Sequence, residues 1–237
     1  REICAEVEKN GCKLTVICQL RFSENVRRVK KLVEENAFGK LVFCDLYMKY
    51  WRSPEYYAAS DWRGTRKLDG GGALMNQGIH GVDLLRYLAG PVVSVQALTA
   101  TRCHAIEAED TVVAVLEFEN GALGTLQATT SVYPGFNRRL EICGSEGTAI
   151  LQEDSIIYSA FRDPSRRLAC TVSCHNTGSR PDGMDHTLHK KQIGAFLDAL
   201  SHGETPFLNA QEGRKAVEIV EAVYTSAKTG KKIYLTK

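Results

Sequence analysis

Long apolar runs, a leader segment and an excess of one charge are all missing from this sequence. No stretch is long and apolar enough to span a membrane, and the opening REICAEVEKN has no hydrophobic signal core. The formal net charge is +2, and lysines and arginines are interspersed with acids, so no basic stripe indicates a nucleic-acid-binding surface. We therefore predict that neither a membrane nor a nucleic acid is a partner of this protein.

Clusters of cysteine at metal-ligand spacing are missing too. The eight cysteines are scattered, and most lie in apolar runs such as LTVIC and LVFCDL, which predicts reduced, buried thiols in a cytoplasmic protein. One segment, CTVSCH, resembles a ligand cluster with Cys170, Cys174 and His175, but no second Cys/His pair stands at the spacing of a zinc site. We expect an ordinary strand there and no metal ion.

Linkers rich in proline and serine, internal repeats and low-complexity tracts are absent, so nothing divides the 237 residues. With 43% hydrophobic and 24% charged residues, the chain can bury a sizeable core. It has no initiator methionine and opens within an amphipathic helix that ends at Asn10-Gly11. We expect the sequence to be part of a longer protein.

The pattern of apolar residues predicts an α+β fold. Six β-rich runs follow one another from Val92 to Phe161, with Asn120-Gly121 as a hairpin turn, which predicts an antiparallel meander. Helical segments precede and follow these runs, so we expect a large, mostly antiparallel open sheet with helices on one face. The other face must meet something, and a second subunit is the simplest candidate. The remaining expected elements are helices over 1–10, 23–36 (with Ser23 as N-cap), within 70–90, and over 186–203 and 209–230, strands over 13–18, 39–51 and 231–235, and an aromatic, charged loop over 52–69.

The stretch GGGALMNQGIHGVDLL, residues 70–85, places polar side chains on an apolar helix. The spacing from Asn76 to His80, then to Asp83 and Tyr87, puts these residues in a line along one helix face. Such a line on a buried helix costs stability unless its members pair with one another or meet a pocket.

Two interpretations of His80 stay open on the residues alone. In the first, His80 and Asp83 satisfy each other, or a backbone group, inside the core. In the second, the glycines at 70–72 let an anionic or electron-rich ligand approach the helix N-terminus, and His80 is a catalytic histidine.

Several motifs follow one another along the chain: RF at 21–22, DWR at 61–63, GGGALMNQGIHGVD, EDTVVAVLEFENGALGTLQATT, YPG, EICGSEGTAIL and GRKAVEIVEAVYTSAKTGKKIYL. In this order they resemble the glucose-fructose oxidoreductase and inositol dehydrogenase family (Gfo/Idh/MocA), and the resemblance covers essentially the whole chain. Its specific core is the series of glycines, an acid or amide, His and Asp within residues 70–83.

The resemblance implies an NAD(P)-dependent oxidoreductase with an N-terminal Rossmann domain and a second domain similar in fold to the C-terminal domain of glyceraldehyde-3-phosphate dehydrogenase. No G-x-G-x-x-G follows a strand here, so only the second domain is expected. On this view residues 1–20 are the last helix and strand of the Rossmann domain. Residues 21–237 then form the substrate-binding domain, which associates into a homodimer or homotetramer through its open sheet. The family's Glu-Lys-Pro segment, whose lysine sits at the reacting carbon, would lie upstream of Arg1.

By position, His80 corresponds to the family's catalytic histidine, which takes the proton from a sugar hydroxyl as hydride leaves its carbon. Asn76 stands where many members have Asp. An amide can bond a hydroxyl but cannot accept its proton, so we expect His80 to carry the proton alone. Asp83 matches the later Asp of the motif, and we expect it to support the helix, to orient His80 or to contact substrate.

The loop that holds Trp62 and Arg63 matches one that lies near cofactor and substrate in relatives, where an arginine binds phosphate or a sugar oxygen. The alternative is a surface loop with a buried Trp62. The remaining candidates, each with a structural alternative, are Gly71 and Gly72 for the cofactor and Arg21, His186 and His189 for the substrate.

The expected function is therefore the reversible oxidation of a secondary hydroxyl of a sugar, polyol or nucleotide sugar with NAD or NADP. One alternative is an NAD-dependent glycoside hydrolase of the same family, which oxidises a sugar carbon transiently and regenerates its cofactor. A second alternative is a non-catalytic association module, because a hydride has nowhere to go without the cofactor domain. The residues that discriminate NAD from NADP belong to that absent domain.

Overall fold

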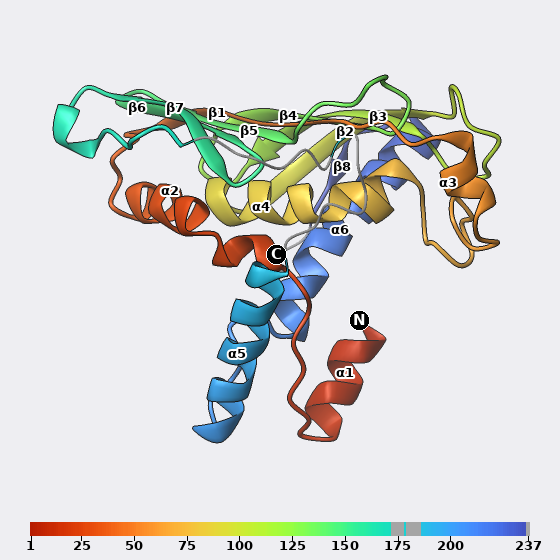
Figure 1. Ribbon diagram of the computed structural model, residues 1–237, viewed down its shortest axis with the longest axis horizontal. Helices are drawn as coiled ribbons and strands as arrows, with labels where there is room; N and C mark the ends of the chain where they lie inside the picture. Colours follow the sequence, from red (N-terminus) through yellow and green to blue (C-terminus); the bar gives the residue numbers. More distant parts are fainter. Residues whose placement is uncertain (172–177, 179–185, 236–237) are drawn as a thin grey trace.

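One large sheet with helices beneath it makes up most of the molecule, of which the computed structural model describes residues 1–171, 178 and 186–235 (Figure 1). The eight strands lie in the order β7-β6-β5-β1-β4-β3-β2-β8. The strands are β1 (Leu41–Lys49), β2 (Val92–Ala100), β3 (Thr111–Phe118), β4 (Leu123–Thr129), β5 (Arg139–Gly144), β6 (Gly147–Gln152), β7 (Ser155–Phe161) and β8 (Ile233–Tyr234). The helices are α1 (Glu2–Lys9), α2 (Glu24–Glu34), α3 (Pro54–Ala58), α4 (Ile79–Ala89), α5 (Thr187–Ser201) and α6 (Ala210–Thr229), with the shorter η1 (Gln19–Phe22), η2 (Ala73–Gly78) and η3 (Pro164–Arg166).

The sheet is mixed rather than one continuous meander. Strands β2–β4 and β5–β7 each form an antiparallel unit, but β1 lies between the two units, parallel to β4 and antiparallel to β5. Leu46 of β1 pairs with Leu126 on one side and Leu140 on the other, and all three side chains are buried. The long apolar strand thus joins two half-sheets, which corrects the prediction of a single meander from Val92 to Phe161.

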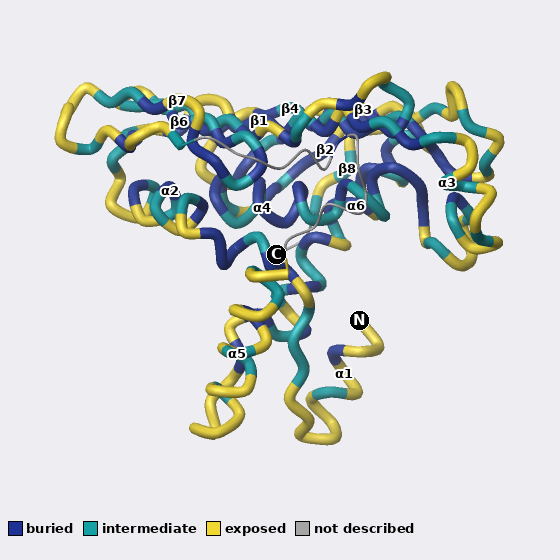
Figure 2. The backbone as a smooth tube through the Cα atoms, viewed as in Figure 1, coloured by how far each residue is buried: buried dark blue, intermediate teal, exposed yellow. Residues whose placement is uncertain are grey.

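Helices α2, α4 and α6 all lie on one face of the sheet, as predicted (Figures 1 and 2). Strand alternation directs Cys44, Leu46 and Met48 of β1 toward this face, where they are buried together with Leu85 and Leu88 of α4. The main core therefore lies between the sheet and these helices. Helices α1 and α5 extend away from it (Figure 1).

The opposite face of the sheet carries apolar side chains that none of the described helices covers. Five apolar residues on this face are partly exposed to solvent: Phe43 (48%), Leu98 (69%), Val113 (44%), Val115 (54%) and Leu123 (49%). Cross-strand pairing sets Phe43 beside Leu123 and Leu98 beside Val113. Large exposed apolar patches are typical of interaction sites. We call these five residues the open-face patch.

Three local predictions are wrong or incomplete. Residues 13–18 form no strand, because the Val16 N–H donates to the Leu208 carbonyl at 2.9 Å instead of entering a ladder. The loop after β1 contains helix α3, which is capped where the Ser53 hydroxyl accepts from the Tyr56 N–H. Ser23 occupies the N-cap position of α2, but its side chain makes no capping hydrogen bond.

The cysteines follow the predicted pattern only in part. All seven that the structure describes are free thiols, of which Cys4, Cys18 and Cys44 are buried. Cys12, Cys103 and Cys170 are exposed because they lie in turns and loops rather than in the apolar elements. Within the described ranges, every helix is too short or too polar to cross a bilayer.

Candidate functional site

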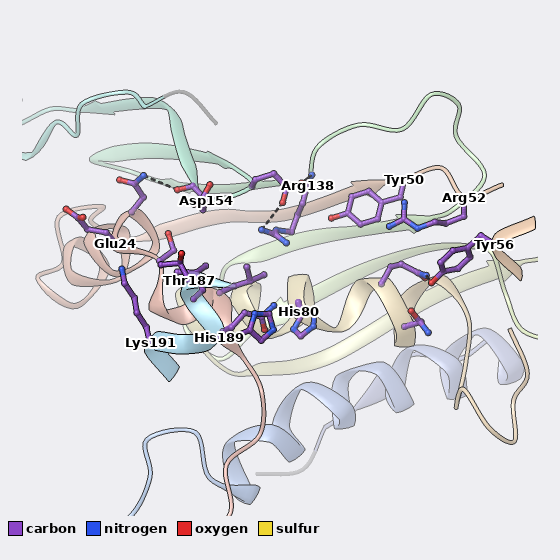
Figure 3. Close-up of a pocket in the computed structure, with 18 of the residues that line it drawn as sticks. Glu24, Tyr50, Arg52, Tyr56, His80, Arg138, Asp154, Thr187, His189 and Lys191 are labelled. Carbon is purple, nitrogen blue, oxygen red and sulfur yellow. Dashed lines mark hydrogen bonds and ion pairs between the residues drawn. The ribbon is translucent and has the colours of Figure 1, made fainter. Parts of the chain in front are cut away.

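A cavity of about 590 Å³ opens among the start of α4, the segments that flank β1 and β5, and the start of α5 (Figure 3). This volume is typical of a site for a small organic molecule. Four of the residues predicted from the sequence line the cavity: Arg63, Asn76, His80 and His189. They come from three separate stretches of the chain, so the fold brings together what the sequence keeps apart.

His80 lies in the first turn of α4 and lines the cavity, and its imidazole makes no hydrogen bond with any described residue. Burial lowers the pKa of His80 below its ordinary 6.5, and the positive charge of Arg138 lowers it further, whereas Asp83 acts in the opposite direction. His80 is therefore a neutral imidazole near pH 7. A neutral imidazole in a cavity is able to accept a proton from a bound hydroxyl.

The wall opposite His80 holds polar residues that the sequence did not single out. Tyr50, Arg52 and Arg138 are buried and line the cavity. Tyr50 and Arg52 continue the inward-facing positions of β1 beyond its end, and Arg138 lies two residues before the inward-facing Leu140. Extending the strand alternation past each strand end would have found all three.

Arg138 is fixed in place by Glu153. Its Nη2 lies 3.1 Å from the Glu153 Oε2, and its backbone N–H donates to the Glu153 Oε1 at 2.8 Å. A return hydrogen bond joins the Glu153 N–H to the Arg138 carbonyl at 2.8 Å. In Figure 3 the guanidinium of Arg138 reaches from the sheet side toward His80. The cavity thus has a rigid positive group opposite its histidine.

The aromatic loop brings Arg63, but not Trp62, to the cavity. Arg63 donates from Nη1 to the Tyr56 carbonyl at 2.9 Å, and its Cζ lies 4.3 Å from the centre of the Tyr56 ring. The Nε of Arg63 is buried without a hydrogen-bond partner, and an unused guanidinium donor suits an oxygen atom of a ligand. Trp62 is 42% exposed and lines no part of this cavity, so the alternative of a buried Trp62 is wrong.

A change of helical pitch divides the predicted polar line. Residues 73–78 are π-helical, and the α-helix begins at Ile79. Asn76 lies in the π-helical turn, lines the cavity with His80 and donates to the Asp69 Oδ1 at 2.7 Å. Asp83 does not line the cavity. Single π-helical turns are frequent at functional sites, and this one accompanies the residues that face the cavity.

Arg21 and Asp83 form a buried ion pair behind the cavity. The guanidinium donates from Nε to Asp83 Oδ2 at 2.9 Å and from Nη2 to Asp83 Oδ1 at 2.6 Å. Its Nη1 donates to Glu212 Oε2 of α6 at 3.1 Å. Arg21 is 1% exposed and Asp83 2%. Each side chain is therefore enclosed with its partner, in agreement with the structural alternative for both residues, and a substrate contact of Arg21 or Asp83 stays a prediction.

Gly71 and Gly72 pack tightly against other parts of this chain. A Cβ on Gly72 would lie 1.8 Å from the Glu109 carbonyl oxygen, and one on Gly71 would lie 2.2 Å from the Tyr224 hydroxyl. The Glu109 carboxylate accepts from the N–H of Gly72 at 3.1 Å and of Leu74 at 3.0 Å. An internal carboxylate thus occupies the helix start, and neither glycine lines the cavity. Their contact with a cofactor stays a prediction.

The two histidines at the start of α5 differ in position. His189 lines the cavity, and its Nδ1 is buried without a hydrogen-bond partner. The ring centre of His186 lies 6.4 Å from that of His189, outside the cavity lining. Only His189 is therefore placed to contact a ligand.

The segment that resembled a metal-ligand cluster is described only at its start. Cys170 lies in no strand, and its Sγ is 3.4 Å from the Ile157 carbonyl oxygen. Cys174 and His175 lie outside the described residues. Among the residues with described positions, no group of three or more His, Cys, Asp and Glu side chains is arranged to hold a metal ion.

Comparison with known proteins gives consistent similarities. A model of the GFO/IDH/MocA C-terminal domain matches residues 26–150. The oxidoreductase YrbE of Bacillus subtilis (strain 168) is 30% identical over 153 residues, which are 62% of this chain and 42% of that protein. The myo-inositol 2-dehydrogenase of Thermotoga maritima is 23% identical over 211 residues, which are 83% of this chain and 57% of that protein. The chain thus spans less than two thirds of either relative.

Solved structures share this fold over 95% or more of the chain. The WlbA dehydrogenase from Bordetella pertussis, crystallised with NADH and UDP-GlcNAcA, is 31% identical with a TM-score of 0.86, over 100% of this chain and 67% of that one. A levoglucosan dehydrogenase with NADH and levoglucosan is 23% identical with a TM-score of 0.79, over 95% of this chain and 67% of that one. At its identity the second match shows the fold alone.

Proposed function

The chain belongs to the GFO/IDH/MocA family, and on that premise we propose that it is the substrate-binding half of an NAD(P)-dependent oxidoreductase. The reaction is the oxidation of a secondary hydroxyl of a sugar, polyol or nucleotide sugar, or the reduction of the ketone. One observation carries the proposal: His80, which belongs to the motif that resembles the family, lines a small-molecule cavity as a neutral imidazole and has no hydrogen-bond partner among the described residues. Relatives that are named as dehydrogenases of levoglucosan, myo-inositol and D-glucosides support the substrate class.

His80 is the general base in the direction of oxidation. Its lowered pKa keeps the imidazole unprotonated, so it accepts the hydroxyl proton as the carbonyl forms. In the reverse direction the imidazolium returns that proton. Asn76 holds a substrate oxygen by hydrogen bonding and takes no proton, because an amide has no basic site at this pH.

The nicotinamide cofactor, when bound, accepts the hydride from the substrate carbon. Arg63 is the residue of this chain that fits such a ligand, because its buried Nε lacks a hydrogen-bond partner at the cavity. The NADH in the WlbA dehydrogenase structure supports a nicotinamide. The choice between NAD and NADP belongs to the dinucleotide-binding domain that we propose for the full-length protein.

Helix α5 supports the proposal that such a domain packs against this chain. Ile193, Leu197 and Leu200 are 48%, 57% and 40% exposed and stand at the i, i+4, i+7 spacing of one helix face. An exposed apolar stripe of this kind is typical of a surface that packs against another domain or protein. We assign residues 1–20 to the end of the Rossmann domain and residues 21–237 to the substrate-binding domain. The apolar stripe lies on α5, which extends away from the sheet beside α1 (Figure 1).

We also propose that the open-face patch joins subunits in a homodimer or homotetramer. The patch is apolar and lies on the sheet face away from the described helices, so two copies are able to pack sheet against sheet. A defined molar mass above that of one chain in light scattering supports this assembly. Substitution of Val115 and Leu98 by Lys is expected to reduce the mass to that of a monomer.

The test of function uses the full-length protein. NAD(H) and NADP(H) are titrated by nicotinamide fluorescence, and sugars, inositols and nucleotide sugars are then screened for the appearance of reduced cofactor. Binding with accumulation of reduced cofactor supports the dehydrogenase. Binding with release of a glycosidic leaving group, and no net reduction, supports the hydrolase alternative instead. If the protein binds no nicotinamide cofactor, both the dehydrogenase and the hydrolase are contradicted, and the non-catalytic association module is the remaining alternative.

A further inference from the structure

Asp69 is hydrogen-bonded through both of its carboxylate oxygens, although it lies outside the lining of the cavity. Its Oδ1 accepts from the Asn76 Nδ2 at 2.7 Å, and its Oδ2 accepts from the Gly64 N–H at 2.9 Å. Asn76 itself lines the cavity, and Gly64 directly follows Arg63, which lines the cavity too. One carboxylate outside the cavity therefore joins two parts of its wall.

The backbone between Asp69 and Asn76 brings the two side chains together. Gly70 follows Asp69 with a φ of +78°, in the left-handed region that favours glycine. The Asn76 N–H then donates to the Gly72 carbonyl at 2.9 Å, at the start of η2. The glycines thus turn the chain so that the Asp69 carboxylate meets the helical turn that carries Asn76.

The contact with Asp69 decides the orientation of the Asn76 amide. A carboxylate only accepts hydrogen bonds, so the amide nitrogen, and not the amide oxygen, must face Asp69. The Asn76 side chain is half-buried, and its Oδ1 makes no hydrogen bond with any described residue and is not one of the fully enclosed polar atoms. The amide oxygen is therefore available to a ligand in the cavity, as a hydrogen-bond acceptor.

The same contact disfavours an acid at position 76. A second carboxylate there would lie at hydrogen-bond distance from Asp69 with no proton between the two, and like charges at that distance repel. An amide keeps an acceptor oxygen without adding a charge. Asp69 and Asn76 thus form a matched pair, in which the charge lies outside the cavity and a neutral acceptor lies in the wall that also holds His80.

We propose that Asp69 is a positioning residue of this site, which fixes the Asn76 amide with its oxygen toward the cavity and makes an amide the residue that fits at position 76. This inference rests on the proposed function for the nature of the ligand. Asp69 acts through Asn76, because it does not line the cavity itself. Asp69 also ties the segment of Arg63 to the same turn through the Gly64 N–H.

The first test exchanges the two side chains and needs no substrate. In the full-length protein, Asn76→Asp is expected to lower the midpoint of urea denaturation, and the deficit is expected to grow from about pH 5 to about pH 8, because the added carboxylate is neutral only when it binds a proton. The double variant Asp69→Asn/Asn76→Asp reverses donor and acceptor and is expected to regain most of the loss.

The matched control for the exchange uses Asp61, an exposed residue that makes no hydrogen bond with a described residue. Asp61→Asn/Asn76→Asp removes the same charge and is expected to stay as unstable as Asn76→Asp. The proposal is overturned if Asn76→Asp is as stable as the wild type at about pH 8. It is also overturned if the Asp69 double variant is no more stable than Asn76→Asp, or if the Asp61 double variant recovers equally.

The second test measures the orientation of the amide by kinetics. Asp69→Asn supplies a donor in place of the carboxylate, so Asn76 is free to turn its nitrogen toward the cavity. With myo-inositol, levoglucosan and UDP-glucose as probes, the KM of a reactive probe is expected to rise about 3- to 10-fold, while kcat changes less. Asp69→Asn/Asn76→Asp restores an acceptor at position 76 and is expected to return KM toward the wild-type value. A purely structural Asp69 would lower the melting temperature and the active fraction without changing KM.

The outcomes separate this proposal from the proposed function. If a probe yields reduced cofactor and its KM is the same in the wild type and in Asp69→Asn, the dehydrogenase stands and the positioning role is wrong. If no screened compound yields reduced cofactor, the dehydrogenase proposal fails, and the exchange of the two side chains alone decides whether Asp69 fixes Asn76.

Discussion

Two buried polar regions meet at helix α4, and they differ in how completely their groups are paired. Behind the helix, the Arg21 guanidinium is hydrogen-bonded to Asp83 and to Glu212. In front, the cavity beside His80 leaves polar atoms of Gln19 and His189 without partners. Pairing, rather than burial, therefore distinguishes the two regions.

The largest expected effect removes the centre of the unpaired region. In the full-length protein, His80→Ala is expected to lower the rate of the chemical step by about 10²- to 10⁴-fold, the range for loss of a general base. The melting temperature should barely change, because the imidazole makes no hydrogen bond with the described residues. Single-turnover kinetics and calorimetry measure the two effects. A variant that keeps the rate of the chemical step but has a lower melting temperature would show that His80 supports the fold rather than the reaction.

Breaking the paired region is expected to destabilise the fold instead. Arg21→Met leaves Asp83 buried without its cation, whereas the half-buried Glu212 keeps Arg86 and Lys215, and the change costs about 3–5 kcal/mol in the free energy of unfolding. Chemical denaturation of the purified protein measures it. The matched control is Arg166→Met, which removes a partly exposed partner of Glu35 and is expected to cost at most about 1 kcal/mol. Equal losses in the two variants would contradict the assignment of Arg21 to the structural framework.

A smaller effect tests the carboxylate at the helix start. Glu109 accepts hydrogen bonds from two backbone N–H groups and from the Tyr224 hydroxyl at 2.9 Å. Glu109→Gln replaces one accepting oxygen with an amide NH₂ group that cannot accept, so we expect a loss of about 1–3 kcal/mol in unfolding free energy. Glu109→Asp keeps the charge and serves as the control for charge alone. If Glu109→Gln is as stable as the wild type, the paired region does not extend to this end of the helix.

The smallest expected effect is a displacement of the pH profile. The pKa of His80 is lowered, first by burial and then by the charge of Arg138. The neutral form is the active base, so the acid limb of kcat/KM in the oxidative direction should fall at a pH below the ordinary 6.5 of histidine. Because the pKa of His80 is lower in the folded protein than the ordinary 6.5, the contribution of His80 to stability is present above pH 6.5 and is lost as the pH falls below that value. An acid limb above 6.5 would contradict a desolvated base.

The sequence predicted the elements well because their patterns are local. The Asn120-Gly121 turn and the Gly at the end of α6 mark boundaries that the structure shares, since Gly121 and Gly230 both have positive φ. The insertion of β1 between β4 and β5 was not predictable in this way. Strand order depends on which apolar faces meet in three dimensions, and the runs from Val92 to Phe161 carry no local signal of a gap.

Site residues that belong to one sequence motif were predictable, whereas site residues that only the fold brings together were not. His80 and Asn76 share one short stretch, so their common position in the cavity followed from the helix. Arg138 and Gln19 come from remote segments, and neither belongs to a motif. Trp62 shows the converse limit, because its place beside Arg63 in the sequence did not bring it to the same wall.

The position of β1 also bears on how quickly this chain acquires its structure. The units β2–β4 and β5–β7 are built from neighbours in sequence, so each is able to form early from local hairpins. The pairings of β1 with β4 and β5 join residues such as Leu46 with Leu126 and Leu140, which requires closing loops of many residues before any ladder is gained. Folding rates fall as such distant pairings increase. The docking of the first strand is therefore the expected bottleneck, and two half-sheets with open edges precede the finished one.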